Sequence, residues 1–356
     1  MEDLVAALST LGSKRILITG HTGFKGSWLT EWLLRYGCQV TGIALDPDVS
    51  PSHFDQLGIE SRIDHHVVDI RDSDSVERIF TKSKPQVVFH LAAQALVRRS
   101  YKDPKETFDI NVGGGINVLE AVRNSSSVEA CVFVTSDKCY LNKELTRGYV
   151  ETDELGGLDP YSASKAAAEL AFATYNNAYF TERTNFAAAS ARAGNVVGGG
   201  DWSEDRIVPD CMRSFIANKP ISLRRPQATR PWQHVLEPLS GYVTLAHRLL
   251  SDAQTARGSW NFGPPEDSIH SVLDVVNSCI HHWGIEVGID SHQSDVHEAG
   301  LLQLNCEKAQ TYLNWRPRWD FERTMAETTE WYKRTSQGEQ VQAVTLEQIK
   351  RYEETI

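Results

Sequence analysis

The first half of the chain alternates short apolar, β-branched runs with longer amphipathic stretches. The apolar runs predict buried strands at Arg15–Thr19, Gln39–Leu45, His65–Asp69, Val87–Ala92 and Ala130–Ser136. The amphipathic stretches predict helices at Ser27–Tyr36, Asp74–Lys82, Thr107–Arg123 and Tyr161–Tyr179. This alternation predicts an α/β fold with a doubly wound, parallel sheet of Rossmann type. Because such sheets bind ligands beyond the carboxyl ends of their strands, the turns after these strands are where site residues are expected.

Composition narrows the classes of partner. The 356 residues are 41% hydrophobic and 23% charged, which suits a folded protein with a sizeable core. A formal net charge of −11 argues against nucleic acid or an anionic membrane as a partner. No run approaches the roughly 18 apolar residues of a membrane helix, and the acidic start lacks the features of a signal peptide. The six scattered cysteines predict free thiols in a soluble, cytoplasmic protein, and no metal site is expected.

A glycine-rich turn, GHTGFKG at positions 20–26, follows the first predicted strand and opens the first predicted helix. Its GxxGxxG spacing lets the backbone turn tightly and approach a pyrophosphate, which then lies on the N–H groups of the helix N-terminus. Placed inside a β-α-β unit, the turn predicts dinucleotide binding. The contacts expected here come from Gly20, Thr22, Gly23, Phe24, Lys25 and Gly26.

The ends of the next strands carry further candidate cofactor contacts. Asp46 lies where a carboxylate accepts hydrogen bonds from the adenosine ribose and repels a 2′-phosphate, which favours NAD over NADP. The alternative is that Asp46 or Asp48 only begins a turn before the next proline. The third and fourth strands end at the same edge with Asp69, Ile70, Leu91, Ala92 and Ala93, where small and apolar groups would line the adenine and ribose sites. The alternative for these residues is a plain role in the core.

A tyrosine and a lysine lie where a later helix is predicted to begin. Tyr161 and Lys165 are i and i+4, so they share one helix face. A free phenol, with a pKa of about 10, is a poor base at neutral pH. An adjacent ammonium and a positive nicotinamide ring favour the phenolate and lower that pKa. The pair therefore suits deprotonation of a hydroxyl while NAD takes the hydride from its carbon, and both residues are candidate catalytic and cofactor contacts.

Together these motifs resemble the extended short-chain dehydrogenase/reductase family, the NAD-dependent epimerases and dehydratases. The segment from Cys306 to Pro317 is similar to that family's C-terminal region, so the resemblance covers nearly the whole chain. Longer strings resemble the branch of sugar-nucleotide dehydratases that acts on CDP-glucose: GHTGFKGSWL (20–29), TSDKCY (135–140), ARAGNVVGGGDW (191–202), DRIVPD (205–210), RPWQHVLEPLSGY (230–242) and WNFGP (260–264). The resemblance implies NAD as cofactor, CDP-D-glucose as substrate, a role in deoxysugar synthesis for surface polysaccharide, and a cytoplasmic homodimer or tetramer.

The triplet Ser136-Asp137-Lys138 indicates the reaction class. Sugar-nucleotide dehydratases typically have Thr-Asp-Glu at this strand end, so a lysine stands at the usual glutamate position. This departure matches the CDP-glucose branch and puts a carboxylate base in doubt. The alternative is a surface ion pair of Asp137 with Lys138.

The resemblance implies a mechanism for these residues. Tyr161, supported by Lys165 and Ser136, removes the sugar O4 proton while C4 is oxidised. Neutral Lys138 then takes the C5 proton, and protonated Asp137 gives its proton to the departing O6. Both unusual protonation states require a shielded pocket, since burial disfavours each charged form.

Candidate substrate contacts come from polar residues of the predicted loops: Gln94, Asn195, Arg206, Arg230 and His234. Guanidinium groups bind phosphate oxygens in pairs, although these cations could instead close ion pairs with the surplus carboxylates. Trp202 and Trp232 either stack on the base or fill a domain interface.

The second half of the chain is less regular and predicts a smaller, mixed α/β C-terminal domain for the substrate. Gly194–Asp201 and Arg224–Trp232 predict loops, and Asp320–Arg334 predicts a late helix. We predict an NAD-binding domain at 13–192 and 237–263, a substrate domain at 193–236 and 264–340, and a charged, mobile tail from Thr335, with 341–356 outside both domains. Two other functions share these motifs: a nucleotide-sugar 4-epimerase, which has no need of an acid–base pair at 137–138, and a non-catalytic NAD-binding scaffold. A dimer would pair the Thr107–Arg123 and Tyr161–Tyr179 helices across a twofold axis.

Overall fold

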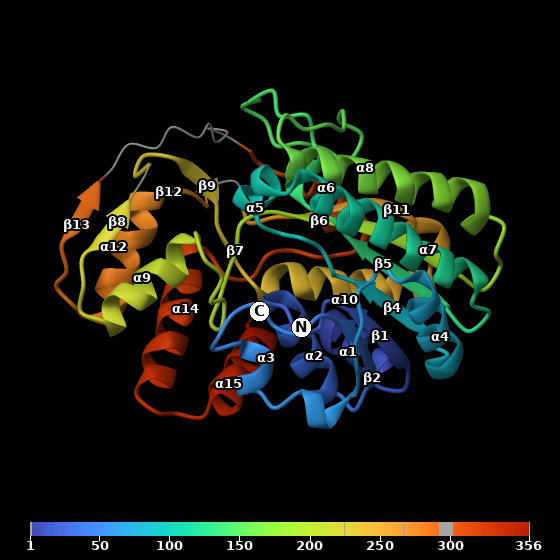
Figure 1. Ribbon diagram of the computed structural model, residues 1–356, viewed down its shortest axis with the longest axis horizontal. Helices are drawn as coiled ribbons and strands as arrows, with labels where there is room; N and C mark the ends of the chain where they lie inside the picture. The colour runs from blue at the N-terminus through green and yellow to red at the C-terminus, as the bar shows by residue number, and fades with distance from the viewer. Residues whose placement is uncertain (1, 224, 266–267, 292–301, 356) are drawn as a thin grey trace.

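A seven-stranded parallel sheet forms the centre of the molecule. The computed structural model describes residues 2–223, 225–265, 268–291 and 302–355 (Figure 1). The strand order is β11-β6-β5-β4-β1-β2-β3. The strands are β1 Arg15–Thr19, β2 Gln39–Ala44, β3 Asp64–Val67, β4 Val87–His90, β5 Ala130–Val134, β6 Ala187–Ala193 and β11 Gly258–Phe262. The five predicted strands are confirmed, each to within two residues, and so is the doubly wound parallel fold.

Helices cover both faces of the sheet (Figure 1). One face packs against α1 Glu2–Leu11, α2 Phe24–Arg35 and α10 Leu236–Ser251, and the other against α4 Ser73–Ser83, α7 Gly115–Asn124 and α8 Pro160–Tyr175. The pleat of β1 explains the two cores, because Ile16 and Ile18 join the first and Leu17 joins the second. Every residue of β4 and β5 is buried, as expected for strands covered on both faces.

The predicted helices are present but subdivided. The helix predicted at Thr107–Arg123 comprises α6 Pro104–Phe108, a π-helical turn η2 Asp109–Gly114, and α7. The helix predicted at Tyr161–Tyr179 comprises α8 and the π-helical turn η4 Asn176–Phe180. Five shorter helices accompany these: α3 His53–Gln56, η1 Glu60–Arg62, α5 Val97–Lys102, η3 Asp137–Cys139 and α11 Ala253–Ala256. Helix α1 was not predicted, although Leu4, Leu8 and Leu11 form a buried stripe on it.

A smaller mixed α/β region lies beside the sheet, at the left of Figure 1. Its paired strands are β7 Val196–Val197 with β10 Gln233–His234, β8 Ile221–Leu223 with β13 Ile289–Ser291, and β9 Thr229–Pro231 with β12 Ile269–Ser271. Its helices are α9 Ile207–Ile216, α12 Val272–Trp283 and α14 Phe321–Ser336, whereas α13 Glu307–Tyr312 packs on β11 of the central sheet. One buried cluster contains residues of both regions, and the domain boundaries stay a prediction.

The mobile tail predicted from Thr335 is wrong. Helix α15, Val341–Glu354, packs on α2 and α14, and Val344, Ile349 and Tyr352 are fully buried. The buried carboxylate of Glu353 accepts a hydrogen bond of 2.8 Å from Trp32 Nε1 on α2. The charges of this segment had suggested a solvated tail, but they lie on one face of an amphipathic helix whose apolar face is inside.

The described residues include no helix that is long and apolar enough to cross a membrane. All six cysteines are buried and carry free thiols, as predicted. Burial raises the pKa of Cys131 and Cys306 to about 12, so these thiols stay protonated at neutral pH.

Candidate active site

The glycine-rich turn joins β1 to α2 and leaves no room for a side chain at Gly20 or Gly26. Gly20 has φ +77°, and a Cβ on Gly26 would lie 2.1 Å from the carbonyl oxygen of Gly20. Helix α2 begins at Phe24, and its N-cap Gly23 supplies no side-chain cap, so N–H groups of its first turn have no side-chain acceptor. The turn therefore fits an anionic diphosphate, which would accept hydrogen bonds from these groups.

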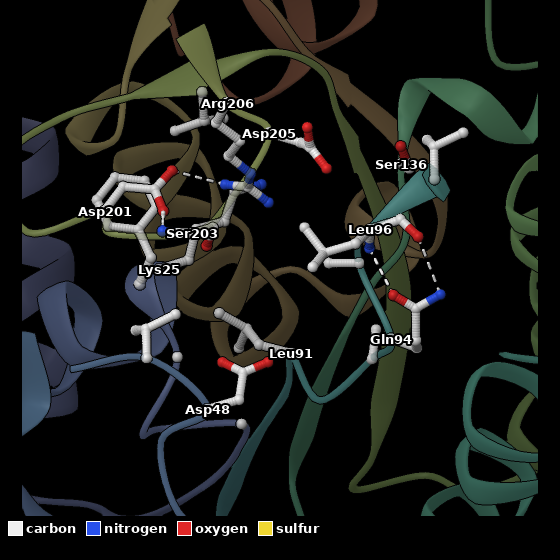
Figure 2. Close-up of a pocket in the computed structure, with 18 of the residues that line it drawn as sticks. Lys25, Asp48, Leu91, Gln94, Leu96, Ser136, Asp201, Ser203, Asp205 and Arg206 are labelled. Carbon is white, nitrogen blue, oxygen red and sulfur yellow. Dashed lines mark hydrogen bonds and ion pairs between the residues drawn. The ribbon is translucent and has the colours of Figure 1, made fainter. Parts of the chain in front are cut away.

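One cavity of about 760 Å³ lies beyond the carboxyl ends of the strands. It is lined by every candidate cofactor residue, every candidate catalytic residue, and all candidate substrate residues except His234. Figure 2 shows part of this cavity, with Asp48 and Leu91 on one side and Asp201 and Arg206 on another. Its volume lies within the range of pockets that bind small molecules and cofactors.

The nucleoside end of the cavity carries exposed carboxylates. Asp46 and Asp48 are both exposed, and Asp48 lies 3.9 Å from Arg99. Asp69 is bonded through both oxygens to Arg71, and these hydrogen bonds hold its pKa below the usual value. Asp46 therefore remains the carboxylate suited to a ribose, whereas Asp69 is already paired.

Tyr161 and Lys165 face the cavity from the first turns of α8. Asp159 caps the helix through the N–H of Ser162, and Pro160 occupies the first turn, as predicted. Lys165 Nζ lies 6.0 Å from the centroid of the Tyr161 ring. Burial lowers the pKa of Lys165 to about 8, which leaves the ammonium largely protonated at neutral pH.

The predicted lowering of the Tyr161 pKa is not produced by the chain alone. Burial raises it to about 12 and outweighs a hydrogen bond with Ser136, which acts in the opposite direction. The spacing of Tyr161 and Lys165 reveals their shared helix face but not how completely the phenol is buried.

The triplet after β5 places a buried acid beside Tyr161. Ser136 Oγ donates a 2.9 Å hydrogen bond to Asp137 Oδ1, and Asp137 is only 3% exposed. Burial raises the pKa of Asp137 above its usual value despite the nearby charge of Lys138. Lys138 is partly exposed at the cavity wall. The alternative of a surface ion pair is therefore wrong for Asp137, and the geometry instead fits a protonated acid.

Two candidate substrate residues are held by the protein itself. Gln94 accepts from the N–H of Leu96 at 2.6 Å and donates to the carbonyl oxygen of Leu96 at 3.1 Å (Figure 2). It also donates to Thr107 Oγ1 at 3.0 Å, so its amide fixes the loop after β4. Arg206 Nη1 donates to Asp201 Oδ2 at 2.7 Å, which matches the ion-pair alternative. Both side chains still line the cavity.

Asn195 and Arg230 line the substrate side of the cavity, and Arg230 Nη1 donates to the carbonyl oxygen of Thr229 at 2.8 Å. Trp202 and Trp232 line it too, and each also packs or bonds within the smaller region, so both of their predicted roles stay open.

His234 is not a substrate contact. It is fully buried, with its ring 4.8 Å from that of Trp319 and 5.9 Å from that of Trp28. Its Nδ1 accepts from the N–H of Leu236, and burial lowers its pKa to about 3. The loop composition suggested a cavity residue, but strand β10 turns this side chain into the core.

Two residues that hold parts of the site in place were not predicted. Asp201 fixes the position of Arg206, and the only sequence signal was its place directly after three glycines. Asn111 lies in the π-helical turn η2 and bonds Ser164 Oγ at 2.8 Å and the Gln94 carbonyl at 3.1 Å. Nothing in the sequence pattern distinguished Asn111, because its contacts join segments that are far apart along the chain.

Comparison with known proteins places this geometry among sugar-nucleotide enzymes. The family model described as GDP-mannose 4,6 dehydratase matches residues 17–328. A CDP-glucose 4,6-dehydratase of Salmonella typhimurium is 42% identical over 344 residues, which cover 95% of this chain and 96% of that protein.

Solved structures agree in fold. A UDP-glucose 4-epimerase of Thermus thermophilus in complex with NAD has a TM-score of 0.76 at 25% identity, covering 90% of this chain and 99% of that chain. A dTDP-glucose 4,6-dehydratase of Bacillus anthracis in complex with NAD has a TM-score of 0.74 at 21% identity, covering 92% and 98%.

Proposed function

The chain belongs to the GDP-mannose 4,6 dehydratase family, and from this premise we propose that it is an NAD-dependent hydro-lyase that converts CDP-D-glucose to CDP-4-keto-6-deoxy-D-glucose and water. The observation that carries this proposal is the buried acid Asp137, which lies beside Ser136 in the same cavity as Tyr161 and Lys165. The choice of CDP-D-glucose rests on the 42% identical relative, whose name gives that activity. The product would supply deoxysugar synthesis for surface polysaccharide.

The cofactor end of the cavity suits NAD. The backbone of the Gly20–Gly26 turn would hold the diphosphate, and Asp46 would accept hydrogen bonds from the adenosine ribose. Bound NAD supplies a hydride acceptor for C4 of the sugar and later a donor for C6. The protein itself supplies the proton transfers.

Tyr161 acts as the base for the sugar O4 proton. Its raised pKa means that the phenol needs support from positive charge, and the Lys165 ammonium is the neighbour on its own helix face. Ser136 adds a hydrogen bond that favours the phenolate.

Asp137 and Lys138 carry out the elimination. The ketone at C4 acidifies the C5 proton, which Lys138 takes, and Asp137 gives its proton to O6 as water leaves. Lys138 returns its proton to C5 when C6 is reduced. The proton that Tyr161 took from O4 then restores Asp137 through Ser136, whose hydroxyl is bonded to Asp137. No net oxidation occurs, and every residue regains its starting state.

A nucleotide-sugar 4-epimerase would use the same Tyr161 and Lys165, but it has no step for a buried acid. The position of Asp137 therefore favours a dehydratase. A non-catalytic scaffold would not need Tyr161, Lys165 and Asp137 gathered in one cavity.

Mass spectrometry of the products tests the reaction directly. Purified protein is incubated with CDP-, dTDP-, UDP- or GDP-glucose, with and without NAD. Loss of one water from CDP-D-glucose alone, with NAD needed only catalytically, supports the proposal. Loss of water from another nucleotide sugar overturns the cytidine assignment, and no loss of water from any of them overturns the dehydratase.

The variant Lys138→Ala tests the base. We expect C4 oxidation to persist, seen as NADH absorbance, while exchange of the C5 proton with deuterated solvent is lost. Normal turnover of this variant would remove Lys138 from the mechanism.

We also propose that the protein works as a homodimer in the cytoplasm. Four large side chains are exposed on neighbouring helical segments: Tyr101 on α5, Phe108 on α6, Leu170 on α8 and Tyr179 on η4. A second copy pairing through α8 and the α6–α7 segment would cover them. Buried free thiols suit a reducing compartment.

Sedimentation of the wild type and of Leu170→Glu tests this assembly. A wild-type dimer or tetramer that the substitution dissociates supports the interface, and a wild-type monomer contradicts it.

A further inference from the structure

A buried ion pair lies behind the catalytic triplet and has no role in the mechanism above. Glu169 of α8 and Arg192 of β6 have side chains that are 1% and 3% exposed, and Arg192 Nη2 lies 2.6 Å from Glu169 Oε2. Neither residue lines the cavity. Two charges removed from water in this way are costly unless their remaining hydrogen-bonding groups are satisfied, so their partners are informative.

The pair is bonded to both flanks of the triplet. Thr135, which directly precedes Ser136, donates a short hydrogen bond from Oγ1 to Glu169 Oε1. On the other flank, Arg192 Nη1 donates to the hydroxyl of Tyr140 at 2.7 Å. The segment that carries Ser136, Asp137 and Lys138 is thus tethered at each end to one ion pair.

The same pair fixes the strand that limits the space of Asp137. Ser190 donates to Glu169 Oε2 at 2.9 Å, and Ser190, Arg192 and Gly194 alternate along β6 and its end. A Cβ on Gly194 would lie only 2.2 Å from Asp137 Oδ2, so the end of β6 sets the room available to this acid. A small shift of β6 would therefore move or compress Asp137.

Glu169 also shares a helix face with the catalytic dyad. Tyr161, Lys165 and Glu169 are spaced at i, i+4 and i+8 on α8. Burial lowers the pKa of Lys165, and the charge of Glu169 acts in the opposite direction. The other charged or titratable groups that act on or sense Lys165 are Tyr161 on the same helix, Cys139 of η3, His90 of β4 and Lys25 of α2.

We propose that Glu169, through its ion pair with Arg192, is a positioning residue that holds the Ser136–Lys138 segment in register with α8. The charge of Glu169, one turn further along α8, also favours the ammonium form of Lys165. This inference rests on the proposed function, because it assigns Glu169 to the oxidation and elimination steps described above. Glu169 acts on the substrate only through Thr135, Arg192 and Lys165.

The first test is Glu169→Gln in the full-length protein, with CDP-D-glucose and NAD. Positioning contacts of this kind are worth about 10- to 100-fold, so we expect kcat to fall by about 30-fold with a smaller change in KM. Loss of the carboxylate also removes the charge that favours the Lys165 ammonium. Deprotonation of Lys165 sets the alkaline limb of the profile of kcat against pH. This limb should therefore move to lower pH by about one unit.

Two further variants distinguish the effect of the Thr135–Glu169 hydrogen bond from the effect of the Glu169 charge. Thr135→Val keeps the ion pair and removes one tether, so we expect a fall in kcat of about tenfold with the alkaline limb unmoved. Glu169→Asp retains the charge, so we expect the limb to return to its wild-type position while kcat stays reduced. These two variants carry the test if Glu169→Gln does not fold.

The matched control is Glu31→Gln. Glu31 is 1% exposed like Glu169 and is bonded to Arg62 at 2.6 Å and to Gln342 at 3.1 Å, so its partners lie outside the Ser136–Lys138 segment, β6 and α8. We expect it to lower the melting temperature without changing kcat or the pH profile. The inference is overturned if Glu169→Gln keeps wild-type kcat and profile, if Thr135→Val turns over normally, or if Glu31→Gln produces the same shift. Failure of the wild type to dehydrate CDP-D-glucose would instead count against the proposed function.

Discussion

The two ends of the cavity are built by different kinds of contact. At the cofactor end, one continuous turn of seven residues provides backbone groups, and Gly26 lies so close to Gly20 that an added methyl group has no space. At the substrate end, side chains from separate segments line the wall, among them Lys138 after β5, Asn195 after β6 and Arg230 of β9.

This difference predicts two patterns of failure. A close backbone contact is lost when a side chain is added to it, because the closely packed interior cannot move to accommodate the extra volume. Charged side chains at a partly open wall contribute in smaller steps, since solvent replaces part of what is lost. Four substitutions test this contrast, and they follow from the largest expected effect to the smallest.

Gly26→Ala should abolish cofactor binding. The new Cβ would lie 2.1 Å from the Gly20 carbonyl oxygen and 2.7 Å from His21 Cα, so the turn must open. We expect no measurable NAD binding by fluorescence titration. Gly113→Ala is the control, because a Cβ there meets nothing within 4 Å. If Gly26→Ala still binds NAD, the cofactor end of the cavity tolerates substitution as well as the substrate end does.

Asp137→Asn should stop water loss while C4 oxidation continues. General acids contribute about 10²- to 10⁴-fold, and we expect turnover to fall within this range. NADH formed in a single turnover should remain visible, because the groups that oxidise C4 are untouched. A variant that loses NADH formation as well would place Asp137 in the first step rather than the second.

The same substitution should stabilise the protein above acidic pH. The folded pKa of Asp137 is raised, so the folded state holds its proton when the unfolded chain has already lost it. The contribution of Asp137 to the free energy of unfolding therefore falls as the pH rises from the pKa of the unfolded state, about 3.9, toward the higher pKa of the folded state. Calorimetry should show Asp137→Asn melting about 2 °C above the wild type at pH 8, with a smaller difference at pH 5. An equal difference at both pH values would contradict the raised pKa.

Local sequence predicted the parts of the site that local backbone builds. The turn at Gly20–Gly26, the start of α8 at Tyr161 and the triplet at Asp137 all follow recognisable strand or cap signals, and each lines the cavity. Their placement needs only the order of strands in a parallel sheet.

What the sequence could not supply is burial and long-range pairing. The pKa of Tyr161 is raised because distant segments close over it, and His234 is inside because β10 pairs with β7. Helix α15 is ordered because α2 and α14 cover its apolar face. These features depend on residues far apart in the chain, which periodicity does not connect.

Arg206→Met should weaken substrate binding without affecting the cofactor. A hydrogen bond to a charged group contributes about 1.5–3 kcal/mol, so we expect KM for CDP-D-glucose to rise about 10- to 100-fold. The companion variant Asp201→Asn releases Arg206 from its ion pair. If Arg206 binds phosphate, this companion keeps or lowers KM. If both variants lose only thermal stability, the ion pair is structural and the phosphate contact is wrong.

Asp46→Ala should have the smallest effect, although it lies at the cofactor end. Its carboxylate is exposed on the cavity rim, so solvent replaces much of any hydrogen bond to the ribose. We expect the NAD dissociation constant to rise by about threefold to tenfold, and the preference for NAD over NADP to shrink because a negative charge near the 2′-phosphate is removed. Asp48→Ala, also exposed and 3.9 Å from Arg99, is the matched control and should leave both constants unchanged. Equal effects of the two variants would show that Asp46 contributes only to the local turn. Loss of NAD binding in Gly26→Ala would then be due to the backbone of the glycine turn alone.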